Sequence, residues 1–161
     1  MNGTEPPGFA DHEFLRGMSP ADVGLLSGAA VRVSIPPGRR LFDESATADK
    51  CWLLMAGQVA LDLHRQPGQP NLIIETLGRG DVLGFSWLAP PHRWQFGAQT
   101  VEPTAAFELD GPDVKALCDR HPELGYQLSL RMLAAAVQRL QATRIRLLDL
   151  YGTPGQGAEV P

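Results

Sequence analysis

The stretch that decides the fold is residues 51–64, CWLLMAGQVALDLH. It begins with a short apolar run from Cys51 to Met55 and reaches a glycine at Gly57. After the glycine, the residues Val59, Leu61 and Leu63 alternate with Gln58, Ala60, Asp62 and His64. An alternation with period two is typical of a strand that buries one face and leaves the other in solvent. The stretch therefore predicts two strands separated by a turn at Gly57, where glycine supplies a positive φ.

The strand-like pattern continues on both sides of this stretch. The further segments are residues 31–35, 72–74 and 104–109, separated by a Pro-Pro-Gly turn at 36–38 and a Gln-Pro-Gly-Gln-Pro turn at 66–70. Glycines at 78, 80 and 84 interrupt the region between them. Several short strands separated by turns predict a small antiparallel β-roll of the jelly-roll kind.

Helical patterns flank the strands at both ends of the chain. Residues 12–30 carry apolar residues spaced for two short helices, and Ser19 and Pro20 suit the N-cap and first position of the second helix. Residues 113–119 predict another short helix, and a long helix follows over about 123–151. The expected fold class is therefore α+β: an antiparallel β-roll with short N-terminal helices and a long C-terminal helix.

The composition fits one folded domain. The 161 residues are 43% hydrophobic and 20% charged, which provides enough apolar surface for a core. We expect a flexible N-terminus at 1–11, the domain at 12–152 and a disordered tail at 153–161. The sequence shows no signal-peptide pattern, and no apolar run approaches the roughly 18 residues of a membrane span. These features predict a cytoplasmic protein that does not contact a membrane.

Several kinds of site are not expected. A net charge of -4 offers no basic surface for DNA, so we expect no direct DNA binding. Cys51 and Cys118 lie far apart in apolar contexts, which predicts two free thiols and no metal site. Common catalytic motifs are absent from the sequence, and Asp43, Glu44 and Asp81 lie near turns, where carboxylates order the backbone. We therefore expect no enzymatic activity and no catalytic residue.

The long helix carries an apolar seam that exceeds the needs of one small domain. About 29 residues at about 1.5 Å per residue extend about 44 Å. After Leu130, the seam consists of Leu133, Val137, Leu140, Arg144, Leu147 and Tyr151, joined by steps of three and four residues. We expect its first two turns to contact the helix's own β-roll and the part beyond Leu140 to contact a second copy. This predicts a parallel homodimer, in which Ile145 and Leu148 face a β-roll.

Four segments resemble, in order, the cyclic-nucleotide-binding domain of the bacterial CRP/FNR regulator superfamily. Residues 35–44 look like its first strand pair, 52–59 its glycine hairpin, 77–84 the entry to its phosphate-binding cassette, and 139–143 part of its dimerisation helix. The resemblance covers about residues 12–152. It implies a short helix after Gly84 whose amides hold the cyclic phosphate. The regulators of this superfamily continue past the long helix into a winged helix-turn-helix domain. Because no such domain follows the long helix in this sequence, we expect a stand-alone form.

The ligand site implied by the resemblance departs from the family at two positions. Phe85 stands where cAMP-binding members have a glutamate for the ribose, and His92 stands where they have an arginine for the phosphate. Arg93 follows, but adjacent side chains alternate in facing, so it reaches the pocket only if the loop is reshaped. The ligand-binding residues expected are Gly84, Phe85, Ser86, Trp87, His92, Arg93 and Thr143. We expect weak cAMP binding that improves as His92 gains a proton below about pH 7.5.

Two functions stay open from the sequence. One is a regulatory sensor that binds a small anionic ligand, cAMP or another cyclic nucleotide, and signals to a protein partner. The other is a scaffold subunit of a larger complex that binds no nucleotide because Phe85, Trp87, Trp94 and Phe96 fill the pocket. A cavity of several hundred Å³ lined by Arg93 and Thr143 would favour the first function, and rings that fill it would favour the second.

Overall fold

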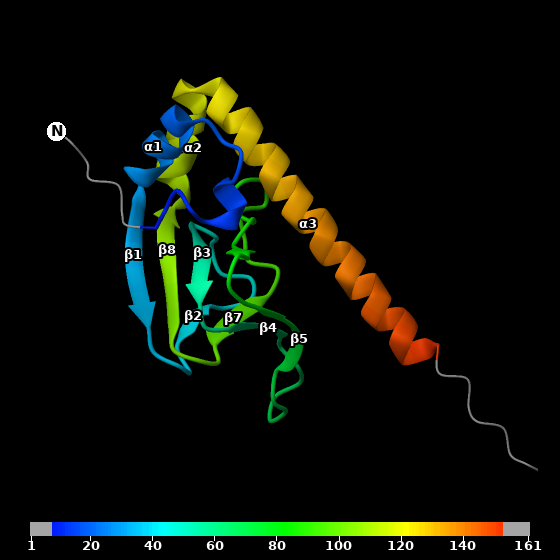
Figure 1. Cartoon of the computed structure of the whole chain (residues 1–161). Helices are drawn as coiled ribbons and strands as arrows, with labels where there is room; N and C mark the ends of the chain where they lie inside the picture. The colour runs from blue at the N-terminus through cyan, green and yellow to red at the C-terminus, as the bar shows by residue number, and fades with distance from the viewer. Residues whose placement is uncertain (1–7, 153–161) are drawn as a thin grey trace, which may run out of the picture.

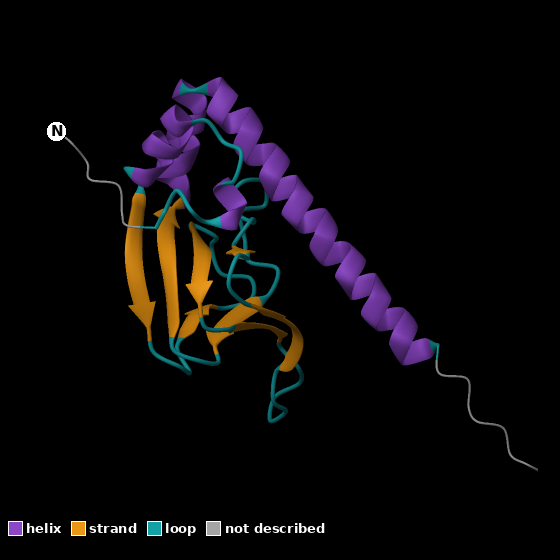
Figure 2. Ribbon diagram, in the orientation of Figure 1, coloured by secondary structure: helices purple, strands orange, loops and turns teal. Residues whose placement is uncertain are grey.

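The computed structural model of this chain describes residues 8–152, which form a β-roll with short helices at one end and a long helix running past it (Figures 1 and 2). The helices are η1 (Glu13–Leu15), α1 (Pro20–Ser27), α2 (Gly111–Arg120) and α3 (Pro122–Tyr151). The strands are β1 (Ala30–Ile35), β2 (Arg40–Phe42), β3 (Lys50–Ala56), β4 (Val59–Leu63), β5 (Leu72–Leu77), β6 (Val82–Leu83), β7 (Gly97–Thr100) and β8 (Thr104–Asp110). The predictions for residues 1–7 and 153–161 lie outside the described residues.

Within residues 8–152 the strands form two four-stranded antiparallel sheets, in the orders β1-β8-β3-β6 and β2-β7-β4-β5. Consecutive strands β3 and β4 belong to different sheets, so the turn at Gly57 carries the chain from one sheet to the other. Gly57 has a φ of +85°, and a Cβ there would lie 2.4 Å from the Pro103 carbonyl oxygen. The predicted glycine turn is confirmed, and the expected fold class with it.

Three aromatic rings pack between the two sheets. The ring of Phe42 on β2 stacks on Trp94, with centroids 3.8 Å apart, and on Trp52 of β3, with centroids 5.7 Å apart. The Trp52 indole N–H donates to a carboxylate oxygen of Glu108 at 2.8 Å, and the other oxygen accepts from Lys50 Nζ at 2.7 Å. The polar edge of a buried ring therefore has a partner, as burial of an indole requires.

The predicted helices are confirmed, and so is the predicted Ser19 cap of α1. The Ser19 hydroxyl accepts a hydrogen bond from the Asp22 amide at 3.1 Å, and Pro20 is the first residue of α1. The Asp110 carboxylate likewise accepts from the Asp113 amide at the start of α2. His121 has non-helical backbone angles, because a residue that precedes a proline avoids the helical region. This one residue separates α2 from α3.

The N-terminal segment packs on the outer face of the first sheet. Phe9 is fully buried, and its ring meets the edge of Phe107 on β8 with centroids 5.1 Å apart. A buried ring three residues before the predicted domain boundary at residue 12 thus belongs to the core. His12 is buried beside it and bonds to the backbone of β3.

We expect the stability of the fold to fall with decreasing pH because of His12. Its Nδ1 accepts from the Phe14 amide at 3.1 Å and its Nε2 donates to the Leu54 carbonyl at 2.9 Å, an arrangement that requires the neutral ring. Burial lowers the pKa of His12, although the Leu54 bond and the carboxylates of Glu13 and Asp81 raise it. The unfolded chain gains a proton near pH 6.5 that the folded chain does not take up. The unfolding free energy should therefore decrease from that pH down to the lowered pKa, by up to about 1.4 kcal/mol per pH unit.

Urea denaturation of the wild type and of His12→Gln between about pH 8 and about pH 5 measures this effect. The variant should be less stable by about 1–3 kcal/mol at the higher pH, because one carboxamide cannot replace both ring nitrogens at once and leaves either the Leu54 carbonyl or the Phe14 amide without its partner. The difference should narrow as the pH falls. His121→Gln, at an exposed residue, is the matched control and should keep the wild-type dependence. Identical pH dependence in the wild type and His12→Gln would contradict the expectation.

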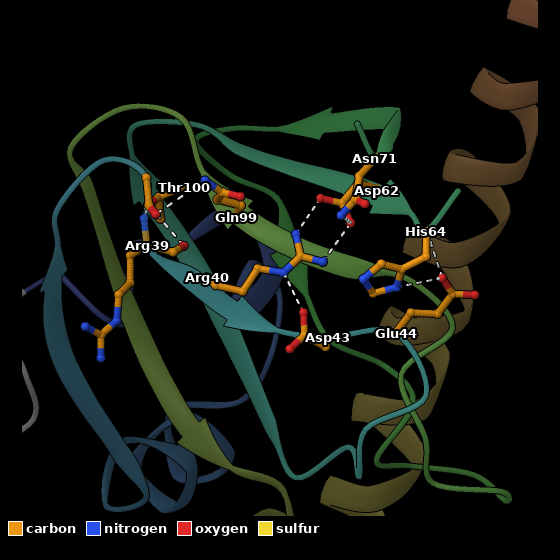
Figure 3. Close-up of polar contacts among 10 residues, drawn as sticks. Arg39, Arg40, Asp43, Glu44, Asp62, His64, Asn71, Gln99 and Thr100 are labelled. Atoms are coloured by element: carbon orange, nitrogen blue, oxygen red, sulfur yellow. Dashed lines mark hydrogen bonds and ion pairs between the residues drawn. The ribbon is translucent and has the colours of Figure 1, made fainter. Parts of the chain in front are cut away.

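Two features of the sheets differ from the sequence predictions. The alternation of apolar and polar residues did not predict strands β2, β6 and β7. They are two to four residues long, which is too short to show a period of two. Strand β4 was expected to expose one face, but Ala60 and Asp62 on that face are buried. Figure 3 shows what covers Asp62: the Arg40 guanidinium reaches across from β2 and donates two hydrogen bonds to Asp62, which also accepts from Asn71.

Candidate functional site

A cavity of about 560 Å³ lies between the β-roll and α3. Strands β2, β4, β5 and β6 supply one part of its wall, the loop after β6 a second part, and α3 a third. We call it the cassette cavity. Its lining combines rings and aliphatic side chains, among them Phe42, Leu61, Phe85, Trp94 and Leu140.

The loop that follows β6 begins with a close approach of two backbones. Gly84 has a φ of +97°, and a Cβ there would lie 2.6 Å from the carbonyl oxygen of Lys50. The Trp87 indole N–H donates to the Gly84 carbonyl at 3.0 Å, and the Leu88 amide donates to the Phe85 carbonyl at 3.0 Å. These bonds form a turn over residues 85–88 and not the short helix that the resemblance implied. Asp81 orders the preceding turn by accepting from the Gly78 amide, as predicted.

The structure brings four of the seven predicted ligand-binding residues to the cassette cavity. Gly84, Phe85 and Ser86 line it from the loop, and Thr143 lines it from α3. Trp87 does not line it, because its ring is buried in the core beside Gly111. Of the four rings considered as pocket fillers, Phe85, Trp94 and Phe96 form walls of an open cavity.

The other two predicted residues, His92 and Arg93, lie outside the cavity lining. His92 has a φ of +55°, and its Nδ1 lies 3.0 Å from the carbonyl oxygen of Trp87. Arg93 is exposed and donates to the Ser45 carbonyl at 2.9 Å, while its backbone pairs with Thr47. The reshaped loop thus turns both side chains away from the cavity. Because His92 does not line the cavity, we no longer expect its protonation to strengthen ligand binding.

The cation that does line the cavity is Arg139, on α3. Its Nη2 donates to the Val82 carbonyl at 2.7 Å, its Nε lies 3.4 Å from Oε2 of Glu75, and its Cζ lies 4.8 Å above the centre of the Phe85 ring. Arg139 was not among the residues predicted for the site. A signal was available, since Arg139 precedes Thr143 by four residues and so shares its helix face.

Burial dominates the electrostatics of this ion pair. It raises the pKa of Glu75, against the opposing influence of Arg139 and Arg146, and Asp81 adds a smaller upward contribution. Burial also lowers the pKa of Arg139, against the influence of Glu75 and Asp81. Side-chain exposure is 20% for Arg139 and 12% for Glu75, so the two opposite charges meet where water screens them little.

The predicted seam of α3 is exposed along its whole length. We keep the name α3 seam for Leu133, Val137, Leu140, Arg144, Leu147 and Tyr151. Two predictions about it were wrong. A different stripe, Leu124, Leu128 and Met132, packs on the domain in the first turns, so Leu130 and Leu133 are exposed. The β-roll also remains within reach beyond Leu140, because Arg146 Nη1 donates to the Ile74 carbonyl at 3.1 Å. Ile145 and Leu148 are exposed and do not pack on their own β-roll.

Among residues 8–152, no three His, Cys, Asp or Glu side chains gather as metal ligands would. Over the same residues, no helix is long and apolar enough to cross a membrane. The thiols of Cys51 and Cys118 are free, as expected, and burial raises the pKa of Cys51 to about 12.

Comparison with known sequences identifies one matching family and several related regulators. The profile of the cyclic nucleotide-binding domain family matches residues 32–121. A CRP-like cAMP-activated global transcriptional regulator of Mycobacterium tuberculosis is 27% identical over 146 residues, which are 89% of this chain and 63% of that regulator. The HTH-type transcriptional regulator Cmr of the same species is 24% identical over 133 residues, which are 83% of this chain and 52% of that protein. The chain thus spans between half and two thirds of the length of these curated relatives.

Solved structures share the fold of this chain. A cyclic nucleotide-binding domain from Methylobacillus flagellatus has a TM-score of 0.73 at 21% identity, covering 86% of this chain and 76% of that one. The catabolite activator protein of Thermus thermophilus has a TM-score of 0.66 at 26% identity, covering 87% of this chain and 63% of that one. The resemblance predicted from the sequence segments is confirmed, and because the profile spans more than half of its residues, this chain belongs to the cyclic nucleotide-binding domain family.

Proposed function

We propose that this chain is a regulatory domain whose ligand occupies the cassette cavity and whose occupancy is reported through α3. The observation that carries the proposal is the position of Leu140. Its side chain lines the cavity, and it also belongs to the exposed α3 seam. A ligand in the cavity would contact the same helix whose other side is free for a partner, so binding at one surface can bias the other.

The open cavity supports a sensor over a scaffold subunit. Its volume falls within the roughly 300–1,000 Å³ typical of small-molecule sites. Thr143 lines it, as the sensor hypothesis required, whereas Arg93 does not. Family membership makes cAMP or another small anionic cyclic nucleotide the first ligand to test.

The α3 seam supports a homodimer. Its apolar members are between 43% and 87% exposed in the single chain, and a heptad-like spacing suits a helix pair. We infer that a second copy covers it and that a further protein partner receives the signal. A net charge of -4 supports a role in which this chain does not itself contact DNA. A cytoplasmic, non-enzymatic regulator fits these features.

A scaffold subunit is the second candidate function. Ile145 and Leu148 are 60% and 71% exposed and lie off the α3 seam. A helix pair through the seam alone would leave them in water. In this alternative α3 binds a larger partner on two faces, and the cavity stays empty.

Native mass spectrometry of the chain purified from its own cells tests the proposal. The wild type should appear at twice 17.4 kDa with a small molecule retained. Leu133→Asp should give a monomer, because two charges would be buried in the seam at a cost of several kcal/mol. Ala136→Trp, which fills the cavity from α3, should lose the small molecule and keep the dimer.

Gln141→Asp and Gln141→Trp are the matched controls for these two variants. Gln141 is exposed on α3, belongs to neither the seam nor the cavity lining, and should tolerate both changes. A dimer without any retained small molecule in the wild type would favour the scaffold. A wild-type monomer would contradict the dimer.

A further inference from the structure

We infer that the cassette cavity takes a neutral, largely apolar ligand with a flat ring, in preference to a cyclic nucleotide. The inference rests on the proposed function and names the chemical class of its ligand. It follows from three properties of the lining: its apolar surface, the balance of its charges and the existing hydrogen bonds of its polar groups.

The apolar surface suits a flat ring. Aromatic walls come from the roll and from the loop, in the form of Phe42, Trp94, Phe85 and Phe96. Phe42 and Trp94 are held parallel to within 13°, so their orientation is fixed before a ligand arrives. Rigid aromatic walls favour ligands that stack or meet them edge-on, with ring centroids about 4.5–7 Å apart.

The charges of the lining cancel. Arg139 is the one Lys or Arg side chain among the described residues that line the cavity, and the Glu75 carboxylate beside it lines the cavity too. Arg139 also donates to the Val82 carbonyl and covers the Phe85 ring. A phosphate would have to displace Glu75 from Arg139 or lie next to its negative charge. Both are unfavourable where water is scarce.

The polar groups of the lining are largely engaged with the protein itself. The Thr143 hydroxyl donates to the Arg139 carbonyl at 3.0 Å, and the Gln95 amide donates to the Arg93 carbonyl at 3.1 Å. His92 and Arg93, the phosphate partners expected from the sequence, lie outside. Ser86 adds one hydroxyl. A ligand rich in hydrogen-bonding groups would leave many of them without partners, whereas an apolar ring would not.

Two fluorescent probes with one skeleton test the inference. N-phenyl-1-naphthylamine is neutral, and 8-anilino-1-naphthalenesulfonate is the same skeleton with an anionic sulfonate. At about pH 8, the wild type should bind the neutral probe about tenfold or more tightly than the anionic one. Millimolar cAMP should not displace the neutral probe.

The Glu75→Gln variant tests the charge argument separately. It leaves Arg139 without its carboxylate, so affinity for the anionic probe should rise about tenfold or more, while affinity for the neutral probe changes less than about threefold. The wild-type comparison of the two probes stands by itself if this variant does not fold. Ala136→Trp should abolish binding of the neutral probe, and Gln141→Trp should not.

The outcomes separate this inference from the proposed function. Tighter binding of cAMP than of the neutral probe would overturn the inference and leave the regulatory domain intact. Unchanged binding of the neutral probe to Ala136→Trp would place the probe on the exposed α3 seam and also overturn it. Failure of both probes and of cAMP to bind would overturn the inference and the proposed function together.

Discussion

Replacing Gly57 by alanine is expected to remove about 2–5 kcal/mol of folding stability, because a positive φ and a steric overlap act at the same residue. The φ of +85° alone disfavours any L side chain by about 1–2 kcal/mol. The new Cβ would also lie 2.4 Å from the Pro103 carbonyl oxygen and 2.7 Å from Cα of Thr104. Both are backbone atoms at the start of β8, so the strand would have to move.

Urea denaturation followed by circular dichroism measures this loss, and Gly68→Ala is the matched control. Gly68 has a φ of +88°, but a Cβ there would meet nothing within 4 Å. It should therefore lose only about 1–2 kcal/mol, the part that comes from φ. The difference between the two variants isolates the overlap between the Gly57 turn and β8. Equal losses would show that the crossing between the sheets tolerates a methyl group.

Signals that were local in the sequence predicted the structure well. The turn at Gly57 follows from a glycine between an apolar run and an alternating strand, and the N-cap of α1 follows from Ser19 before a proline. The cap of α2 and the three short strands lacked such signals. Strands of two to four residues are defined by their neighbours in the sheet, and the sequence alone does not contain that information.

The candidate site was predicted in part, for the same physical reason. Gly84 and Thr143 were found because a glycine-punctuated loop and a helix position are recognisable in the sequence. The directions of His92 and Arg93 were not, because tertiary bonds to Trp87 and Ser45 decide them. The role of Arg139 depends on Glu75, which precedes it by 64 residues and meets it only when α3 folds back along β5.

Asp62 is the clearest case in which tertiary structure overrides a pattern. Its place in the alternation predicted a solvent-exposed carboxylate on β4. The structure instead buries it, because Arg40 from β2 donates to both of its oxygens and Asn71 adds a third bond (Figure 3). The Arg40 hydrogen bond lowers the pKa of Asp62, against burial, which raises it. A period of two identifies the faces of a strand but not what covers them.

An Asp62→Ala variant is therefore expected to lose about 3 kcal/mol of folding stability, near the lower end of the range for breaking a buried ion pair. The side chain of Asp62 is 7% exposed and that of Arg40 25%, so the freed guanidinium keeps some water and its bond to Asp43. Asp119→Ala breaks the exposed pair with Lys115, whose side chains are 68% and 54% exposed, and should lose less than about 0.5 kcal/mol. Urea denaturation of both variants at about pH 7 compares them. Asp62→Asn, which keeps a carbonyl acceptor, should fall between these values. If Asp62→Ala lost as little folding stability as Asp119→Ala, the pair of Arg40 and Asp62 would stabilise the second sheet no more than an ion pair on the surface does.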